Sequence, residues 1–250
     1  MPQRLEVIGL SGLPEVRAGD DLPALLREAA GAAGGFADGD VLVIAQKIVS
    51  KAENRFVDLR AVSPGERAIR IARHCDKDPR QVEVILSEST EILRHRPGVL
   101  IVRHRLGHVL ANAGIDASNV PQRDGSEFVL LLPRDPDASA EAIRRRAGAR
   151  IGVVINDSPG RAWRAGSVGI AIGCAGVKTV ADLRGQTDRD GRTMQASELA
   201  IADELAAAAS IVMGQAAEGV PAAIVRGAGD MLGEGRAADL VRDRDMDLFR

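Results

Sequence analysis

The chain has 250 residues, of which 45% are hydrophobic and 27% are charged, and its formal net charge is -2. This length and composition are ordinary for a soluble globular protein with one large domain or two intimately packed subdomains. The small net charge gives no overall attraction to nucleic acid or to a membrane surface, and the longest apolar runs are too short to span a bilayer.

The N-terminal half is predicted to begin with strand and helix and to continue as an antiparallel meander. Asp20 and Asp21 are predicted to cap a helix that Gly34 and Gly35 end. Three short strands are expected between Glu91 and Asn112, because glycine-containing turns interrupt the apolar pattern there. The other expected elements are a strand Leu5–Leu10, a helix Leu22–Ala33, a strand Val41–Lys47, and helices Pro64–Cys75 and Pro79–Leu86.

The C-terminal half is predicted to mix strands with two longer helices. The expected elements are a strand Phe128–Leu132, a helix Asp135–Ala147, strands Ile151–Ile155 and Val168–Ile172, a helix Ser197–Met213 and a strand Pro221–Val225. In the last helix, Ile201, Leu205, Ala208 and Val212 are predicted to line one face. The pattern favours an α+β fold with mixed or antiparallel sheets in two intimately packed subdomains, with a soft boundary near 148–150.

Two acidic positions follow apolar strands and are the leading metal candidates. Asp116 lies in the loop Asn112–Asn119, and Asp157 follows the strand Ile151–Ile155 with Ser158 next to it. Carboxylate and hydroxyl oxygens suit a magnesium ion that also binds phosphate. The alternative stays open that both aspartates are turn residues that accept backbone N–H groups.

Basic residues and small residues give further candidates. All but four of the 33 basic residues are arginine, and two of the four lysines, Lys47 and Lys51, stand four residues apart. Lysine is a common phosphate binder, although both could simply be solvated. The segment Gly160–Gly166 holds Arg161, Arg164 and the only tryptophan, and is either an anion-binding loop or a surface loop pinned by a half-buried Trp163.

Several common catalytic signatures are missing from the sequence. There is no G-x-x-x-x-G-K-[ST] phosphate loop, no G-x-S-x-G elbow and no complete G-x-G-x-x-G. The four histidines lack metal-ligand spacing, and Cys75 and Cys174 give no disulfide framework. The N-terminus has no secretory pattern, so a cytoplasmic location is expected.

Several segments together resemble the coenzyme F-420-0:γ-glutamyl ligase family across nearly the whole chain. The most specific of them is Asn112–Asn119. The others, in chain order, are Gly12–Pro14, Gly19–Leu22, Asp38–Val41, Ser50–Glu53, Gly160–Arg164, Gly173–Lys178, Ala202–Glu204 and Pro221–Gly227. The resemblance implies a GTP-dependent ligase that adds L-glutamate to the deazaflavin precursor F-420-0, and an intertwined homodimer with an α+β fold.

The resemblance also implies site residues. Asp116 and Asp157 would be metal ligands and, with Lys51, catalytic; Ser158, where the family usually has Thr, would be a further ligand. Arg161 and Arg164 are candidates for holding an acidic substrate. The residues expected to face GTP are Leu13, Pro14, Glu15, Val16, Gln46, Lys47, Lys51, Asn119, Met213, Gly214, Gln215, Ala216, Ala217, Glu218, Gly219 and Val220.

Two departures from the family pattern qualify these expectations. Gln215 stands where the family often has a glutamate that binds a second metal, so that ligand would lose its charge. Gln46 and Lys47 replace small hydroxyl residues of archaeal members. The cofactors implied are GTP as co-substrate and Mg²⁺ or Mn²⁺, and a monovalent cation is a further candidate.

Two other functions remain open from the sequence. One is a related acid–amino acid ligase that acts on another carboxylate acceptor. The other is a catalytically silent protein that binds nucleotide or deazaflavin, an alternative that rests on Gln215. The expected partners are coenzyme F-420-0 and L-glutamate as substrates and a second copy of the chain, with no nucleic acid and no membrane.

Overall fold

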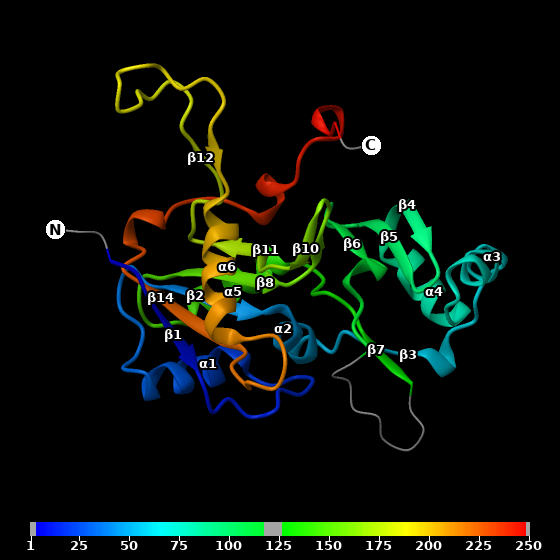
Figure 1. Ribbon diagram of the computed structural model, residues 1–250. Coiled ribbons are helices and arrows are strands. Elements are labelled where there is room, and N and C mark those ends of the chain that lie inside the picture. Colours follow the sequence, from blue (N-terminus) through cyan, green and yellow to red (C-terminus); the bar gives the residue numbers. More distant parts are fainter. Residues whose placement is uncertain (1–3, 118–126, 249–250) are drawn as a thin grey trace.

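The molecule has two parts, of which the larger, called here the larger layer, is built around a five-stranded mixed sheet (Figure 1). The computed structural model describes residues 4–117 and 127–248. The sheet has the spatial order β1-β14-β2-β8-β11, in which β2 and β8 are parallel and the other neighbours are antiparallel. Its strands are β1 (Glu6–Leu10), β2 (Val41–Ala45), β8 (Gly152–Asp157), β11 (Ile170–Ala175) and β14 (Ala222–Arg226).

Helices cover both faces of this sheet. Helix α6 (Ile201–Met213) lies over one face, as Figure 1 shows, and α1 (Leu22–Ala32) and α5 (Pro136–Arg145) pack on the other. The side chains of β2 alternate accordingly: Leu42 and Ile44 join the core with α1 and α5, while its valines join the core with α6. Burial on both faces explains why β2 is a continuous apolar run rather than an alternating one.

Residues 56–117 and 127–130 build a second, smaller lobe, which lies in the sequence between α2 (Gln46–Ala52) and α5. Helices α3 (Glu66–Cys75) and α4 (Pro79–Ser87) pack on a three-stranded antiparallel sheet and share a separate hydrophobic core with it. The predicted meander is therefore confirmed. The strands of this lobe are β3 (Phe56–Asp58), β4 (Ser89–Arg96), β5 (Val99–His104), β6 (Val109–Ala111) and β7 (Phe128–Leu130), with β3 paired to β7.

The α+β class is confirmed, with helices and with mixed and antiparallel sheets. Residues 148–150, where the sequence suggests a soft boundary, connect α5 to β8, and both of these elements contribute to one core. The two cysteines are free and buried in different cores. Within the described ranges, no helix combines the length and apolar character needed to cross a membrane.

Three sequence predictions need correction. The strand expected over Val41–Lys47 ends at Ala45, and helix α2 begins at Gln46, because short apolar runs suit a strand and a buried helix equally well. Helix α6 begins at Ile201 instead of Ser197. Its buried face is Ala202, Leu205, Ala206, Ala209 and Met213, so only Leu205 of the predicted face is fully buried.

A long polar arm was not predicted. Strands β12 (Ala181–Asp182) and β13 (Glu198–Leu199) pair at its base, and the segment between them projects from the body, at the top of Figure 1. Glycine and charged residues give this segment no hydrophobic period, so no helix or strand was predicted there. Short 3₁₀ helices complete the fold: η1 (Leu59–Ala61), η2 (Asn112–Gly114), η3 (Gly229–Met231), η4 (Ala237–Leu240) and η5 (Arg244–Met246).

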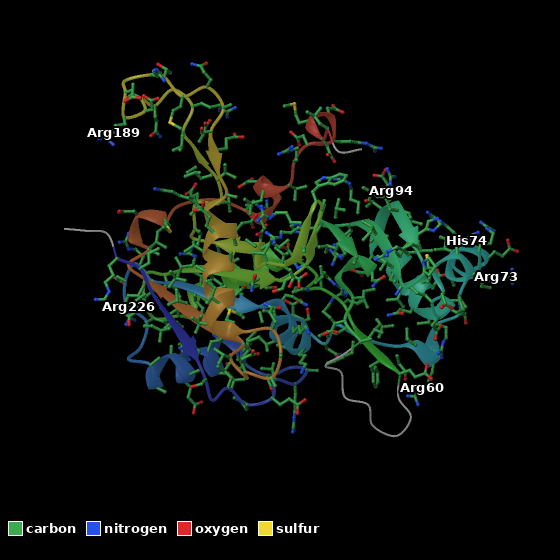
Figure 2. The ribbon with its side chains drawn as sticks, in the orientation of Figure 1. Arg60, Arg73, His74, Arg94, Arg189 and Arg226 are labelled. Carbon is green, nitrogen blue, oxygen red and sulfur yellow. The ribbon has the colours of Figure 1, made fainter. Side chains whose placement is uncertain are left out.

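An ion pair between the half-buried Arg226 and a buried aspartate joins two strands of the central sheet. Asp40, just before β2, is fully buried and accepts hydrogen bonds from Arg226 Nε at 3.0 Å and Nη2 at 2.8 Å. Arg226 also donates to the Gly35 carbonyl at 2.9 Å. Figure 2 places Arg226 at the margin of the larger layer, whereas Arg73 and Arg94 point outward from the second lobe.

Substitution Arg226→Lys is expected to lower the free energy of unfolding by about 1–2 kcal/mol, because lysine keeps the charge but loses the two-pronged geometry. Urea unfolding of the variant and of the wild type at pH 7 measures this difference. The exposed-site substitution Arg73→Lys should change stability by less than about 0.5 kcal/mol. Equal effects of the two substitutions would contradict a stabilising role for this ion pair.

Candidate active site

The site forms where β2 and β8 end side by side. These parallel strands are in register, with Ala45 opposite Asn156, so their carboxyl ends meet at one edge of the sheet. Helix α2 starts there with Gln46 and Lys47, next to Asp157 and Ser158. Polar residues at the carboxyl ends of parallel strands commonly form ligand sites.

Asp116 reaches this edge from the second lobe. Its backbone pairs with Leu130 in both directions, at 3.0 and 2.8 Å, which fixes the segment that carries it. Its Oδ2 lies 2.7 Å from Lys47 Nζ. The two lobes therefore meet at an ion pair between Asp116 and Lys47.

A strained turn precedes Asp116. Asn112, Ala113 and Gly114 all have positive φ angles, of 52°, 55° and 67°. For a non-glycine residue such as the fully buried Ala113, this conformation costs on the order of 1–2 kcal/mol. Asn112 Oδ1 accepts a hydrogen bond from Leu100 N at 3.3 Å, so this amide supports the turn. Strain held in place by packing is common at functional sites.

The donor atoms suit a hard divalent cation. Burial raises the pKa of the Asp157 carboxyl above its ordinary value, and the negative charge of Asp116 adds to the rise, while Ser158 N–H and Lys47 oppose it. A divalent cation would relieve the repulsion between two such carboxylates, and oxygen ligands are the kind that Mg²⁺ prefers. Within the described ranges, no cluster of three or more His, Cys, Asp or Glu side chains offers a metal site. A cation here would therefore also need hydroxyl, amide, phosphate or water oxygens.

The structure brings Gln215 to Ser158. Gln215 Nε2 donates to Ser158 Oγ at 2.9 Å, although 57 residues separate them in the sequence. The amide oxygen of Gln215 and the hydroxyl of Ser158 thus lie near Asp157. Gln215 therefore lies beside Ser158 and Asp157, whereas Asp116 approaches Asp157 and Ser158 from the side of the second lobe.

Two neighbouring hollows open at this edge. The larger has a volume of about 450 Å³ and lies between α2 and the loop after α6. The smaller, of about 260 Å³, is walled by β6, by the turn before Asp116 and by Pro159 and Gly160. The residues common to both hollows are Gln46, Lys47, Asp157 and Ser158.

The loop after α6 closes the larger hollow. Gly214 has a φ of 71°, where any other residue would be strained, and a β-carbon there would also displace the Glu218 side chain. Glu218 Oε2 accepts the Ala216 N–H at 2.7 Å, and this bond lowers the pKa of the Glu218 carboxyl. Of the loop residues expected to face GTP, seven line the hollow: Met213, Gly214, Gln215, Ala216, Glu218, Gly219 and Val220.

The other predicted nucleotide residues differ in where they lie. Lys51, on α2, lines the larger hollow. The turn Leu13–Val16 lies away from both hollows: Val16 is buried in the core beneath α1, and Pro14 and Glu15 border a separate surface depression. Ala217 does not line the larger hollow. Asn119 lies outside the described residues.

Arg161, Trp163 and Arg164 form an exposed hairpin next to the smaller hollow. Strands β9 (Gly160–Arg161) and β10 (Arg164–Ser167) pair antiparallel, with Trp163 in the turn between them. Trp163 is 85% exposed, so the expectation that a half-buried Trp pins this loop is wrong. The strands on either side of Trp163 are too short to show an alternating apolar pattern, so the sequence did not reveal the hairpin.

A largely buried carboxylate that the sequence did not single out joins the two lobes. Glu88, at the end of α4, lies 3.1 Å from Arg55, 3.0 Å from Arg105 and 3.3 Å from the fully buried His104. Arg55 also donates to the Leu132 carbonyl of the larger layer. No short motif connects residues so far apart, so no sequence signal marked this network.

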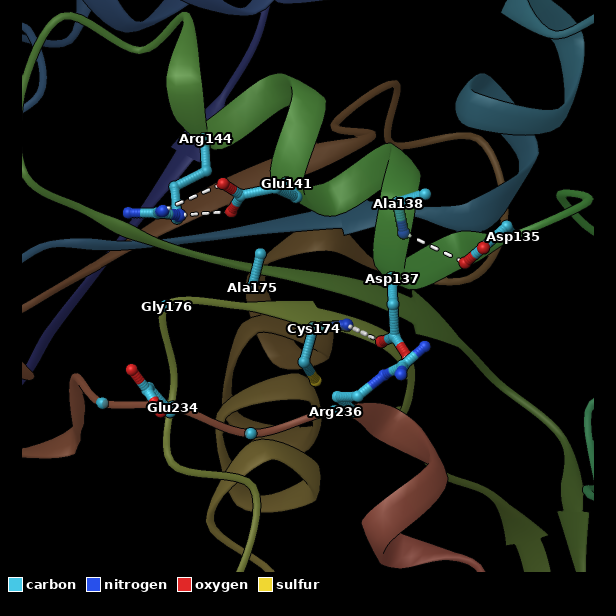
Figure 3. Close-up of a pocket in the computed structure, with 12 residues that line it drawn as sticks. Asp135, Asp137, Ala138, Glu141, Arg144, Cys174, Ala175, Gly176, Glu234 and Arg236 are labelled. Atoms are coloured by element: carbon cyan, nitrogen blue, oxygen red, sulfur yellow. Dashed lines mark hydrogen bonds and ion pairs between the residues drawn. The ribbon is translucent and has the colours of Figure 1, made fainter.

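A further hollow of about 590 Å³ lies beside the N-terminal end of α5 (Figure 3). Asp137 accepts the Cys174 N–H at 2.8 Å and the Ala237 N–H at 3.1 Å, and pairs with Arg236 at 3.5 Å. Glu141 pairs with Arg144 at 2.6 Å on the same wall. These charged groups have partners within the protein itself, so no ligand is assigned to this hollow.

Comparison with known proteins matches the chain to one family. Residues 12–227 match the family model of F420-0:Gamma-glutamyl ligase. Proteins named coenzyme F420:L-glutamate ligase from Methanothermobacter thermautotrophicus, Methanocaldococcus jannaschii and Archaeoglobus fulgidus are 46%, 41% and 43% identical to it. The alignments cover 98–99% of this chain and 99%, 98% and 97% of those proteins. The chain therefore belongs to the F420-0:gamma-glutamyl ligase family.

Proposed function

We propose that the protein catalyses the GTP- and divalent-metal-dependent ligation of L-glutamate to coenzyme F-420-0, and further γ-linked additions. The observation that carries this proposal is the pair of hollows that meet at Gln46, Lys47, Asp157 and Ser158. A ligase that activates one substrate with a nucleotide needs two compartments that share a reacting centre. The names of the relatives contain coenzyme F420 and L-glutamate, and the description of the family contains F420-0, which supports the choice of acceptor and amino acid.

The larger hollow is proposed to hold GTP and the smaller one the acceptor carboxylate with glutamate. Lys47 and Lys51 both border the larger hollow, and Lys47 also borders the smaller one. Their charges would neutralise phosphate oxygens. Asp116, Asp157, Ser158 and Gln215 would hold Mg²⁺ or Mn²⁺, which supplies charge neutralisation at the phosphates when bound.

The proposed reaction has two steps. A carboxylate oxygen of the acceptor attacks the γ-phosphorus of GTP, the bond from that phosphorus to the β-phosphate oxygen breaks, and GDP leaves. The glutamate amine then attacks the carbonyl carbon of the acyl phosphate, loses a proton and expels inorganic phosphate. Lys47 stays in place during both steps, because Asp116 holds its ammonium group. From there it neutralises the negative charge of the phosphate oxygens at the junction of the two hollows.

A homodimer in which the subunits interlock is part of the proposal. The arm that projects between β12 and β13 supports it, because such an extension finds few contacts within its own body (Figure 1). Ile211 on α6 is 85% exposed, which also favours a covered surface. Sedimentation of the intact chain should therefore give a mass near twice 26.3 kDa. A cytoplasmic location remains a prediction.

The function is tested by incubating the protein with GTP, Mg²⁺ or Mn²⁺, L-glutamate and F-420-0. The expected result is a product whose mass exceeds that of the acceptor by one or more glutamate residues, with one GDP released per addition. Binding of GTP without GDP release in this mixture would favour the silent binding protein instead. Ligation with a different carboxylate acceptor but not with F-420-0 would favour the related acid–amino acid ligase.

A further inference from the structure

We propose that the β9–β10 hairpin recognises the acceptor, with the Trp163 indole stacked on the acceptor's planar ring and Arg161 and Arg164 on its phosphodiester. This inference rests on the proposed function, because that function supplies an acceptor with a deazaflavin ring and a lactyl-phosphate tail. Three independent features of the hairpin lead to it.

The first feature is the placement of Trp163. A tryptophan normally buries most of its large apolar surface, yet this one is 85% exposed. It is the second of the two residues in the turn and has a φ of 66°. Turns of this kind favour glycine at that position, since a bulky side chain with positive φ is strained. The hairpin therefore holds an indole out into solvent where a glycine would fit better.

The second feature is a pair of like charges. Arg161 and Arg164 are register partners directly opposite each other on the two strands, so their side chains share one face. Like charges in this relation destabilise a hairpin. Across residues 4–117 and 127–248, no carboxylate forms an ion pair with either arginine; Arg161 donates to the Ala165 carbonyl at 3.2 Å. An anionic ligand between the two guanidinium groups would remove the repulsion.

The third feature is the order of groups along the hairpin. The chain runs from Asp157 and Ser158, at the junction of the two hollows, through Gly160 on the wall of the smaller hollow, to the tip. Trp163 lies three residues beyond Gly160, within roughly 10 Å along the chain. An acceptor with its carboxylate at the junction would place its phosphodiester next and its ring farthest out. That order matches the arginine pair followed by the tryptophan.

The chain offers a direct optical test, because it has one tryptophan and no tyrosine. Indole emission therefore reports Trp163 alone. Titration of the whole protein with F-420-0, without GTP or glutamate, should quench this emission saturably and beyond the loss seen with free N-acetyltryptophanamide at equal acceptor concentration. GTP with Mg²⁺ should leave the emission unchanged. Quenching no greater than that of the free indole derivative would overturn the stacking role.

Steady-state kinetics provide a second test. Trp163→Gly removes the ring and relieves the strain, so it should raise the KM for the acceptor about tenfold, with kcat and the KM for GTP within twofold. Trp163→Phe should restore most of the loss. Arg161→Gln and Arg164→Gln should each raise the KM for the acceptor about tenfold, and Arg73→Gln, at an exposed and distant site, should not.

These outcomes separate the inference from the function beneath it. If the wild type ligates glutamate but the hairpin variants keep its KM for the acceptor, the hairpin has no role in recognition. If the wild type ligates no glutamate to F-420-0, the proposed function fails. The quenching titration needs neither GTP nor glutamate, so it still decides whether the hairpin binds the acceptor.

Discussion

Substitution Asp116→Asn should lower kcat for glutamate addition at least about 10³-fold, the loss expected when a charged group that organises a phosphoryl-transfer site is removed. Asp116 holds Lys47 at 2.7 Å and borders the hollow where the acceptor carboxylate is proposed to react. The neutral amide would no longer hold Lys47, and it would weaken the binding of a metal ion at the junction. Glutamate addition is measured by mass, and GDP release is measured in parallel.

The fold should survive this substitution. Asparagine has nearly the same shape, and the pairing of residue 116 with Leu130 uses only backbone atoms. The ion pair is partly exposed, so its loss should change the free energy of unfolding by no more than about 1 kcal/mol. Asp76→Asn is the matched control, because Asp76 is exposed with a φ of 50°, which asparagine tolerates. Turnover at the wild-type rate by the Asp116 variant would exclude the assigned role.

Substitution Glu88→Gln should lower the free energy of unfolding by about 3 kcal/mol at pH 7, because it leaves Arg55 and His104 without their shared carboxylate. Burial alone would raise the pKa of Glu88, but His104, Arg105 and Arg55 outweigh it and hold the pKa at about 2, below its ordinary 4.5. One pKa unit corresponds to about 1.4 kcal/mol, which gives the expected size.

The sign of the pH dependence follows from this lowered pKa. A carboxyl with a depressed folded-state pKa stabilises the fold above its ordinary pKa, and the stabilisation is lost as the pH falls from 4.5 toward about 2. The difference between wild type and variant should therefore shrink from about 3 kcal/mol at pH 7 to about half of that at pH 3. Urea unfolding at both pH values measures it.

The exposed Glu66 provides the control for this experiment. It lies 3.9 Å from Arg70 on α3, and Glu66→Gln should change stability by less than about 0.5 kcal/mol at either pH. Because Glu88 joins the lobe that carries Asp116 to the layer that carries Asp157, its loss should also lower kcat about tenfold. A pH-independent stability difference would contradict the ionic account of Glu88.

The sequence predicted those elements whose period is long or whose caps are explicit. Asp21 caps α1 by accepting from Ala24 N at 3.2 Å, and the helix ends at Ala32, just before the expected glycines. The start of α2 was not predictable, because Ala45 provides no side-chain cap and no glycine or proline separates it from β2. Long-range pairing decides the rest: β2 lies between β14 and β8, which come from distant parts of the chain.

The residues of the candidate site also differ in how far the sequence could predict them. Asp116 and Asp157 were marked by their positions after apolar strands. The parallel pairing of β2 with β8 brings Asp157 to the start of α2, whereas Asp116 reaches Lys47 from the second lobe. The contact between Gln215 and Ser158 depends on how the loop after α6 folds back, which local sequence does not specify. The exposure of Trp163 was missed for the opposite reason, since sequence statistics favour a buried tryptophan.

The most direct test of the central claim follows one oxygen atom. F-420-0 labelled with ¹⁸O in its terminal carboxylate is incubated with the protein, GTP, Mg²⁺ and L-glutamate, and the released phosphate and nucleotide are analysed by mass. If the acceptor carboxylate attacks the γ-phosphorus at the junction of the two hollows, one ¹⁸O atom should appear in inorganic phosphate for each first glutamate added. Unlabelled phosphate, or label recovered in GMP, would contradict activation through an acyl phosphate.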